Sequence, residues 1–468
     1  FGSSCWEDPP RLELLRQLSL VYMALSLRGL LAVALCAPAR AACAACAVPE
    51  GTTWPEADND MSLLQKGLHL DGGLQQAGSQ LVQNKPVPEV FVDLDVAPEL
   101  RWRNVTRYYT DLGVFPKVLQ VSKDNIAPEA KALLQSLKVD EEHMRELRGM
   151  VAEFSHILND PEATLDLLVL AQFGYELSGW REGNAGVVGD MPLFAPQTLL
   201  GALGAMVKQT GCSGLLAAMS NGTVVHVRNM DYTGFEVEVE GRMFHWPEVT
   251  VEVTFLRSGK PFITGTQWPG IVGFHTAVRH GGWSFEQNTR LHNEDSSYIW
   301  GFRGSGGYLL EVRKIMQSEA DFESAVSKLR DLNLMAPSYF VVAGPKPYQG
   351  AVITVDRGGA HEPITPPVVR LGSTAPRLQA AKAAQGQRYT GSWHIIQTND
   401  DQGGLPMDLR RPSAELSLAE STQDMVSVNW AFWLMTTPPL YNDATVFTSV
   451  FVPSWGYHQT YAHPEHAR

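Results

Sequence analysis

Residues 212–231 read CSGLLAAMSNGTVVHVRNMD, and the rest of the chain is organised around them. A small and apolar run is followed by Ser220-Asn221-Gly222 and then by residues 223–227, which are rich in β-branched side chains. This order predicts a β-hairpin. Asn221-Gly222 favours a two-residue turn in which both residues have positive φ. Cys212 is the only cysteine after position 46, so more than half of the chain shares one thiol.

A two-residue turn fixes which residues of the two strands face each other. Counting back from the turn pairs Cys212 with Asp231, with their Cβ atoms about 5 Å apart. Under strict alternation Arg228 then lies on the opposite face, and it reaches the thiol only if a β-bulge re-aims it. The same pattern also fits an ordinary hairpin with a buried cysteine and no chemistry.

Cys212, with the run Arg228-Asn229-Met230-Asp231-Tyr232, resembles the start of the mature catalytic chain in the acid ceramidase and N-acylethanolamine-hydrolysing acid amidase family. That family belongs to the N-terminal-nucleophile hydrolases, as do bile salt hydrolases and penicillin V acylases. The resemblance runs, with gaps, from about Pro88 to Trp455. It implies an α+β fold, an αββα sandwich of two stacked antiparallel sheets, with an N-terminal helical small subunit.

The resemblance and the composition divide the chain into five predicted segments. Residues 1–47 form a targeting segment and residues 48–87 a flexible polar leader. Residues 88–178 form a helical, propeptide-like α subunit. Residues 179–211 are an insertion before the cleavage site, where the family has only a few residues. Residues 212–468 form the catalytic β subunit.

Periodicity and turn signals predict the main elements. Capping-box patterns at Ser318-Glu319-Ala320-Asp321 and Ser417-Leu418-Ala419-Glu420 each predict the start of a helix. Further helices are predicted over residues 127–138, 140–157 and 161–176. Strands are predicted over residues 249–256, 261–266, 283–287, 339–343, 351–356, 393–398 and 445–452.

The composition is that of a globular protein, with an apolar fraction of 44% over 468 residues. The formal net charge of −13 argues against a nucleic-acid partner, because such proteins carry basic patches that neutralise phosphate. An acidic chain also loses net charge as the pH falls, which suits an acidic compartment. The chain begins with Phe1, which leaves open whether residues precede it.

The first residues have the pattern of a signal peptide. Arg11, Arg16 and Arg28 precede or interrupt an apolar run over residues 18–36, and Ala39-Arg40-Ala41 follows as a small-residue cleavage site. No later stretch approaches the ~20 apolar residues that span a bilayer. We expect a soluble protein in the lysosome, in another acidic compartment or outside the cell. A membrane-anchored form is the alternative if the segment is retained.

The other cysteines and the sequons suggest little chemistry. Cys43-Ala44-Ala45-Cys46 has metal or redox spacing, but it lies beside the predicted cleavage site without a second ligand pair. We therefore predict no metal site and no cofactor, and Cys212 as a free thiol. Asn104-Val105-Thr106 and Asn221-Gly222-Thr223 are N-glycosylation sequons, and the second falls at the predicted turn.

A single cysteine needs a base. Papain-like enzymes supply a histidine, but the histidines here have no recognisable local signature. If the Gly211–Cys212 peptide bond is cut, the freed α-amino group of Cys212 lies beside its own thiol and can act as the general base. Gly211 also leaves the scissile carbonyl unhindered for attack by the thiol.

The resemblance assigns roles to several residues. Cys212 is both the self-cleaving residue and the nucleophile. Arg228 matches an arginine that lines the site, and Asp231 matches the carboxylate that holds the α-amino group. Asn288 aligns with a position whose backbone N–H helps to form the oxyanion hole. Asn399, in a Thr-Asn motif, supplies the side-chain amide that completes it.

Two further positions carry an ambiguity. Arg410 matches another site arginine, with Arg411 as the alternative one residue along. The family often has an acidic residue where this chain has Thr289, which alters the predicted proton network. Any one of the matched residues alone is more often a turn residue or a surface charge. Their joint occurrence in the family's order carries the prediction.

The resemblance predicts an amidase made as an inactive precursor and cleaved autocatalytically before Cys212 into α and β subunits. It would hydrolyse the amide bond of fatty-acyl lipids, N-acylethanolamines or ceramides. Aromatic-rich loops near residues 243–246 and 268–269 would line an acyl channel or touch a membrane surface. The alternatives are a bile-salt or penicillin-type acylase of the same superfamily, and a catalytically inactive lipid-binding homologue.

Overall fold

The structure is a computed structural model. It describes residues 85–123, 134, 137–154, 160–174, 176, 211–232, 235–290, 307–356, 367–372, 388–389, 392–402 and 406–464. The predicted targeting segment, most of the leader, most of the predicted helix 127–138 and residues 179–210 lie outside these residues. Residues Gln80–Arg468 form one compact unit, so the predicted α and β subunits lie within a single unit.

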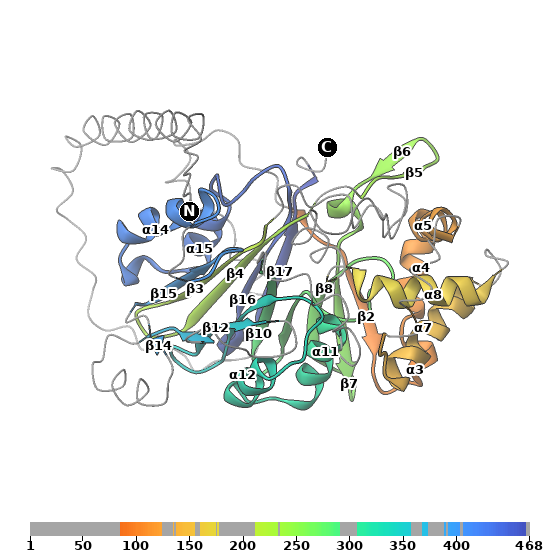
Figure 1. Ribbon diagram of the computed structural model, residues 1–468, viewed down its shortest axis with the longest axis horizontal. Coiled ribbons are helices and arrows are strands. Elements are labelled where there is room, and N and C mark those ends of the chain that lie inside the picture. The colour runs from red at the N-terminus through yellow and green to blue at the C-terminus, as the bar shows by residue number, and fades with distance from the viewer. Residues whose placement is uncertain are drawn as a thin grey trace, which may run out of the picture. The chain divides into compact units, whose positions relative to one another are not determined.

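Two β-sheets are stacked face to face (Figure 1). The six-stranded sheet has the order β1-β17-β16-β4-β3-β15, and the nine-stranded sheet has the order β14-β13-β12-β11-β10-β9-β8-β7-β2. The strands of the first are β1 (Lys85–Pro86), β3 (Ser213–Ala218), β4 (Val224–Asp231), β15 (His394–Gln397), β16 (Thr445–Val452) and β17 (Tyr457–Ala462). Those of the second are β2 (Glu89–Asp93), β7 (Val251–Arg257), β8 (Lys260–Gln267), β9 (Thr276–Arg279), β10 (Ser284–Thr289), β11 (Ser338–Ala343), β12 (Gly350–Val355), β13 (Val368–Arg370) and β14 (Arg388–Tyr389).

Helices cover the outer face of each sheet (Figure 1). α14 (Arg410–Ala419) and α15 (Val428–Met435) pack on the six-stranded sheet. α11 (Tyr308–Ser318) and α12 (Phe322–Arg330) pack on the nine-stranded sheet. The predicted αββα sandwich is therefore confirmed. Its pairs are antiparallel except at the two edges of the nine-stranded sheet, where β2 pairs with β7 and β13 with β14 in parallel.

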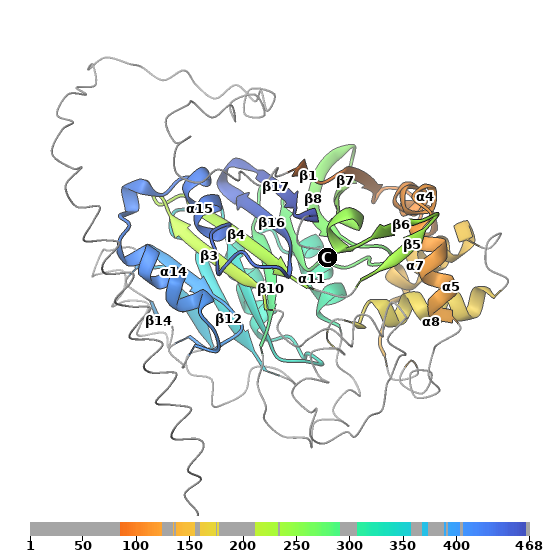
Figure 2. The same cartoon turned by 90° about the horizontal axis from the view of Figure 1, so that it is seen from above.

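The N-terminal helices gather at one end of the sandwich (Figure 2). They are α3 (Pro98–Arg101), α4 (Arg103–Asp111), α5 (Val114–Lys123), α7 (Glu141–Phe154) and α8 (Pro161–Ala171), and the last two confirm the helices predicted there. The end of the predicted leader adds β1 to the edge of the six-stranded sheet. The start of the predicted α subunit, where the sequence also indicates a strand, adds β2 to the edge of the nine-stranded sheet.

The strand predictions agree with β7, β8, β10, β11, β12, β15 and β16, but both predicted capping boxes are wrong. Asp321 caps α12, with its carboxylate accepting the Ser324 N–H at 3.0 Å. Ser318 is the last residue of α11, a helix that the sequence did not reveal. Ser427 caps α15, and Ser417 lies inside α14. A Ser-x-x-acidic spacing caps a helix only where the preceding backbone is not already helical.

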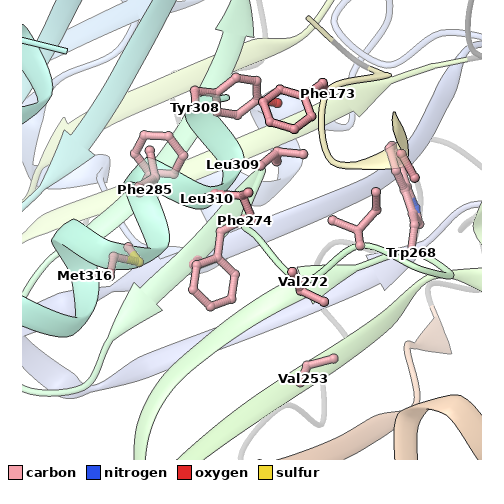
Figure 3. Close-up of a cluster of buried hydrophobic side chains, with 14 of the residues drawn as sticks. Phe173, Val253, Trp268, Val272, Phe274, Phe285, Tyr308, Leu309, Leu310 and Met316 are labelled. Atoms are coloured by element: carbon pink, nitrogen blue, oxygen red, sulfur yellow. The ribbon is translucent and has the colours of Figure 1, made fainter. Parts of the chain in front are cut away.

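One core joins the N-terminal segment to the sandwich. Figure 3 shows Phe173, which follows α8, beside Tyr308 and Leu309 of α11. Phe285 of β10 and Phe274, ahead of β9, belong to the same cluster. The remaining elements are the hairpin β5 (Val237–Val239) and β6 (Arg242–Phe244), and the 3-10 helices η2 (Trp246–Val249), η4 (Gln423–Met425) and η5 (Pro453–Trp455). Among the described residues, no helix has the length and apolar character needed to cross a membrane.

Candidate active site

The predicted hairpin is present as β3 and β4, but its loop is one residue longer than expected. The backbone N–H of Met219 donates to Thr223 O at 2.8 Å, which leaves Ser220, Asn221 and Gly222 as a three-residue loop. Only Gly222 of the three has positive φ, at +87°. The two-residue turn is therefore wrong, and a single glycine supplies the left-handed conformation.

The longer loop changes the register by one residue. Ser213 pairs with Asn229 and Gly214 with Arg228, so continuing the ladder places Cys212 opposite Met230 rather than Asp231. A shift of one residue exchanges the two faces of a strand. Arg228 therefore lies on the face of the thiol without any bulge, and the predicted pairing of Cys212 with Asp231 is wrong.

Cys212 lies immediately before β3 and is buried, with 1% of its surface exposed. Arg228 Nη2 lies 3.2 Å from its Sγ, and Met230 Sδ lies 3.5 Å from it. The guanidinium therefore places a positive charge beside the sulfur. Met230 was not predicted to be near the site, although alternation with the correct loop length would have placed it there.

Arg228 is held by groups from the nine-stranded sheet. Its Nη1 donates to His275 O at 2.9 Å and to the Thr276 hydroxyl, and its Nη2 donates to Gln287 O at 3.0 Å. The guanidinium also lies over the Phe447 ring, 5.7 Å from the centroid. These contacts fix the positive charge between the sheets, beside the sulfur.

Arg410, the first residue of α14, binds the backbone on both sides of the predicted cleavage point. Its Nη1 donates to Gly211 O and, at 2.9 Å, to Cys212 O. Its Nη2 donates to Asn399 Oδ1 at 2.9 Å and to Asp408 Oδ2 at 2.7 Å. The structure thus brings Arg410, Asn399 and Cys212 together.

Arg411, the alternative to Arg410, points to a different set of groups. Its Nε lies 3.2 Å from Asp400 Oδ1, and its Nη1 donates to Asp401 O at 3.0 Å. Arg410 is therefore the arginine that contacts the Gly211–Cys212 backbone. Arg411 is also buried, and it contacts the loop that follows β15.

Asp231 is buried at the end of β4. Its carboxylate accepts from the Thr445 hydroxyl at 2.8 Å and from Asn442 Nδ2 at 3.1 Å, and it lies 3.6 Å from Arg410 Nη1. Burial raises the pKa of Asp231 to about 6, against the lowering effect of Arg410. Continuing the ladder places Asp231 opposite Gly211, next to the nitrogen that cleavage would release as an α-amino group.

The side-chain amides of Asn288 and Asn399 link the two sheets. Asn288 Nδ2 donates to Gln397 O of β15 at 3.1 Å. Asn399 Nδ2 donates to Thr289 O of β10 at 2.7 Å. Thr289, which stands where the family often has an acid, thus contributes through its carbonyl. The oxyanion roles of the two asparagines stay predictions.

Gly211 is surrounded so closely that a side chain has no room. A Cβ atom at this position would lie 2.1 Å from Asn399 Oδ1 and 2.3 Å from Arg410 Nη2. A glycine before Cys212 is therefore required by the packing of the site. Gly211 is the only residue of the predicted insertion that the structure describes.

The remaining predicted sites are at the surface. Asn104 is exposed on α4, and Asn221 is exposed in the hairpin loop, so both sequons are accessible. Glycosylation itself stays a prediction. Within the part of the chain that the structure describes, no group of three or more His, Cys, Asp or Glu side chains is arranged to hold a metal ion.

Comparison with known proteins finds relatives that match most of the chain. The N-acylethanolamine-hydrolyzing acid amidase of Oryctolagus cuniculus is 26% identical over 390 residues, which cover 80% of this chain and 88% of the relative. The acid ceramidase of Heterocephalus glaber is 23% identical over 393 residues, which cover 80% and 86%. The resemblance read from the sequence is confirmed. The predicted enzyme class, a hydrolase of amide bonds, agrees with the names of these relatives.

Solved structures give matches over about half of the chain. A Caenorhabditis elegans N-acylethanolamine-hydrolyzing acid amidase ortholog is 25% identical, covers 54% of this chain and all of its own, and has a TM-score of 0.44. A conjugated bile acid hydrolase from Clostridium perfringens is 14% identical, covers 54% and 89%, and has a TM-score of 0.29. No family model matches the chain.

Proposed function

We propose that this protein is a cysteine amidase that cleaves its own chain before Cys212 and then hydrolyses the amide bond of fatty-acyl lipids. One observation carries the proposal: two buried arginines contact the two groups that would react, the Cys212 sulfur and the Gly211 carbonyl. Arg228 lies at the Cys212 sulfur, and Arg410 donates to the Gly211 carbonyl. A nucleophile and an electrophile that are both polarised in this way are prepared for acyl transfer.

In the proposed cleavage, Cys212 Sγ attacks the carbonyl carbon of Gly211. A C–S bond forms, the C–N bond to Cys212 breaks, and the nitrogen takes a proton to become an amine. Water then hydrolyses the thioester, which gives a carboxylate at Gly211 and restores the thiol. Arg410 would stabilise the negative charge that develops on the Gly211 oxygen in the first step.

The released α-amino group would serve as the base for turnover. It would take the proton of the thiol as the sulfur attacks a substrate amide, and deliver a proton to the leaving amine. Asp231, opposite Gly211 in the continued ladder, would bind this amino group when ionised. Water would then hydrolyse the acyl-thioester to a free fatty acid, with no cofactor involved.

An aromatic cluster beside the thiol supports an apolar acyl group in the substrate. Trp268 stacks on Tyr232 with centroids 5.5 Å apart and lies 4.3 Å from the Trp246 centroid. Phe447, which lies under the Arg228 guanidinium, contacts Trp268 at 6.3 Å. Buried aromatic rings bind hydrocarbon through their large apolar faces. The names of the relatives point to N-acylethanolamines and ceramides.

We place the activity in an acidic compartment, the lysosome above all, reached through the predicted signal peptide. The relatives are named acid amidase and acid ceramidase. A membrane-surface contact belongs to the same proposal only for Met243, which is exposed, because Trp246 and Trp268 are buried.

The deciding experiment is intact mass and N-terminal sequencing before and after incubation at acidic pH, with Cys212→Ala beside the wild type. A new N-terminus at Cys212 that is absent from the variant is the expected result. Activity is then compared on N-acylethanolamines, ceramides and conjugated bile salts, where hydrolysis of bile salts alone would favour the acylase alternative. An intact chain in both samples that binds fatty amides without turnover would identify an inactive lipid-binding homologue.

A further inference from the structure

Glu286 lies in the middle of β10 and is fully buried. It pairs with Thr276 on β9 and with Val341 on β11. A Cβ atom built on Gly214 would fall 1.7 Å from Glu286 Oε1, so the carboxylate of one sheet lies against the backbone of the other. Gly214 is two residues after Cys212 and shares its face of the strand. Glu286 therefore approaches the strand that follows the thiol.

The carboxylate of Glu286 is weakly compensated. Its Oε2 lies 3.4 Å from His226 Nε2, an ion-pair distance that is long for a hydrogen bond. His226 Nδ1 lies 2.8 Å from Ser284 Oγ. By distance and angle neither carboxylate oxygen accepts a hydrogen bond from the described residues, and His226 and Asn288 are its nearest side-chain partners. Burial raises the pKa of Glu286, against the lowering effects of His226, Arg228 and Asn288.

Arg228 connects this carboxylate to the thiol. It lies directly opposite Gly214 and donates to the hydroxyl of Thr276, the residue that pairs with Glu286. The same guanidinium lies 3.2 Å from Cys212 Sγ. An ionised Glu286 and a Cys212 thiolate would therefore be two anions that share the positive potential of one arginine.

Other charged groups surround this position. His226 and Arg228 come from β4, and Cys212 lies just before β3. The further described ionisable side chains near these groups are Asp231, which interacts with Arg228, Arg410, which donates to Cys212 O, His275 ahead of β9, and His458 on β17, which stacks on Phe451. Of the groups that interact with Glu286 itself, Arg228 is the permanent cation, so this interaction persists at every pH of interest.

We propose that Glu286 is a positioning residue for the nucleophile. When ionised it competes with Cys212 for Arg228, and when protonated it leaves the guanidinium to the thiolate. Ionisation of Glu286 thus weakens the interaction of Arg228 with the Cys212 sulfur. A role of Glu286 in catalysis rests on the proposed function, whereas its effect on the Cys212 thiol does not.

The test is a titration of the Cys212 thiolate by its ultraviolet absorbance, taken as a difference from Cys212→Ser, with the cleavage state fixed by intact mass. Glu286→Gln keeps the shape of the side chain and removes its charge. We expect the ratio of thiolate to thiol at a fixed pH to rise about threefold to tenfold in this variant. Glu286→Leu, which also removes the charge, is to shift the titration in the same direction, and it replaces Glu286→Gln if that variant does not fold.

Glu252→Gln is the matched control. Glu252 is also buried between the sheets, where it accepts the Thr460 N–H at 2.6 Å and lies 3.7 Å from His458. Its removal is to leave the thiolate titration unchanged. A Glu286→Gln curve that superposes on the wild type, or an equal shift in Glu252→Gln, overturns the proposal. A shifted titration without amidase activity would instead reject the proposed function and leave the role of Glu286 standing.

Discussion

Two buried arginines reach Cys212, one at the sulfur and one at the backbone, and they are anchored differently. Arg228 is fully buried between the sheets and is held by two backbone carbonyls of the nine-stranded sheet in addition to the thiol. Arg410 lies at the start of α14 with a tenth of its side chain exposed, and it is held by Asp408 and Asn399. Arg228, which contacts the sulfur, is thus held by the sheets of the sandwich. Arg410, which contacts the carbonyl, is held by residues at the start of one helix and in a loop.

The difference separates two steps of the proposed chemistry. The contact of Arg228 with Cys212 Sγ does not involve the Gly211–Cys212 bond, so it persists after cleavage. The contact of Arg410 with Gly211 O is made to a group that leaves with the N-terminal product. We therefore expect changes at Arg410 to affect cleavage most, and changes at Arg228 to affect both cleavage and turnover.

Arg410→Gln is expected to have the largest effect. It removes the donors to Gly211 O and Cys212 O and should slow autocatalytic cleavage by about 10²- to 10³-fold, the usual loss for one oxyanion donor. The measurement is the rate at which the N-terminus at Cys212 appears. Arg411→Gln is the control, since this equally buried neighbour contacts Asp400 and Asp401 instead. Equal slowing in both variants would mean that α14 is only being destabilised.

Gly211→Ala tests the carbonyl side without removing a charge. The added Cβ would lie 2.1 Å from Asn399 Oδ1 and 2.3 Å from Arg410 Nη2, so the scissile carbonyl must move. A displacement of this order costs about 10²-fold in rate. Cleavage is followed by mass spectrometry. Gly259→Asn is the control, because a Cβ there meets nothing within 4 Å and asparagine tolerates its positive φ. Unchanged cleavage in Gly211→Ala would contradict the described packing.

Arg228→Lys should give a smaller loss, shared by both steps. Lysine keeps the charge but loses the planar fork that bridges the thiol and the carbonyls of the nine-stranded sheet. We expect cleavage and amide hydrolysis to slow together by about tenfold, because both reactions use the sulfur that Arg228 contacts. The measurement is the initial rate of cleavage and the initial rate of amide hydrolysis, each compared with the wild type. A loss confined to cleavage would remove the distinction between the two arginines.

Runs of β-branched and aromatic residues between turn signals predicted the positions of most strands, whereas the sandwich itself was implied by the resemblance. The prediction failed at the hairpin, where Asn221-Gly222 indicates a two-residue turn and the chain forms a three-residue loop. That single residue moved Asp231 away from the thiol and placed Arg228 beside it. Loop length depends on how β4 packs between β3 and β16, which no local pattern records.

The order of the motifs in the sequence identified the site residues. It did not predict which groups those residues contact. Neither the resemblance nor the spacing indicated that Arg410 binds both carbonyls around the cleavage point. Glu286 was also missed, because an acid within the strand SFEQNT resembles a solvent-facing residue. Its alternation with the inward-facing Asn288 was the available signal.

The smallest predicted effect concerns stability and extends the comparison to carboxylates away from the arginines. Burial raises the pKa of Glu176 to about 8 and that of Glu252 to about 8, above their ordinary value of 4.5. The folded protein then binds more protons than the unfolded chain, so stability is lost as the pH rises towards 8. Buried histidines act in the opposite sense, since the pKa of His458 falls to about 3 and that of His394 to about 4, but only below their ordinary 6.5.

Between pH 6.5 and 8 the two glutamates should therefore dominate over Asp231, whose pKa of about 6 is already passed. We expect the free energy of unfolding to fall by about 1 to 2 kcal/mol for each glutamate over this range. Denaturant unfolding at the two pH values measures the change. Glu252→Gln should show a smaller fall than the wild type, because one of the two groups no longer titrates. Stability that is constant or rises from pH 6.5 to 8 would show that the charges of Glu176 and Glu252 are compensated in the folded protein.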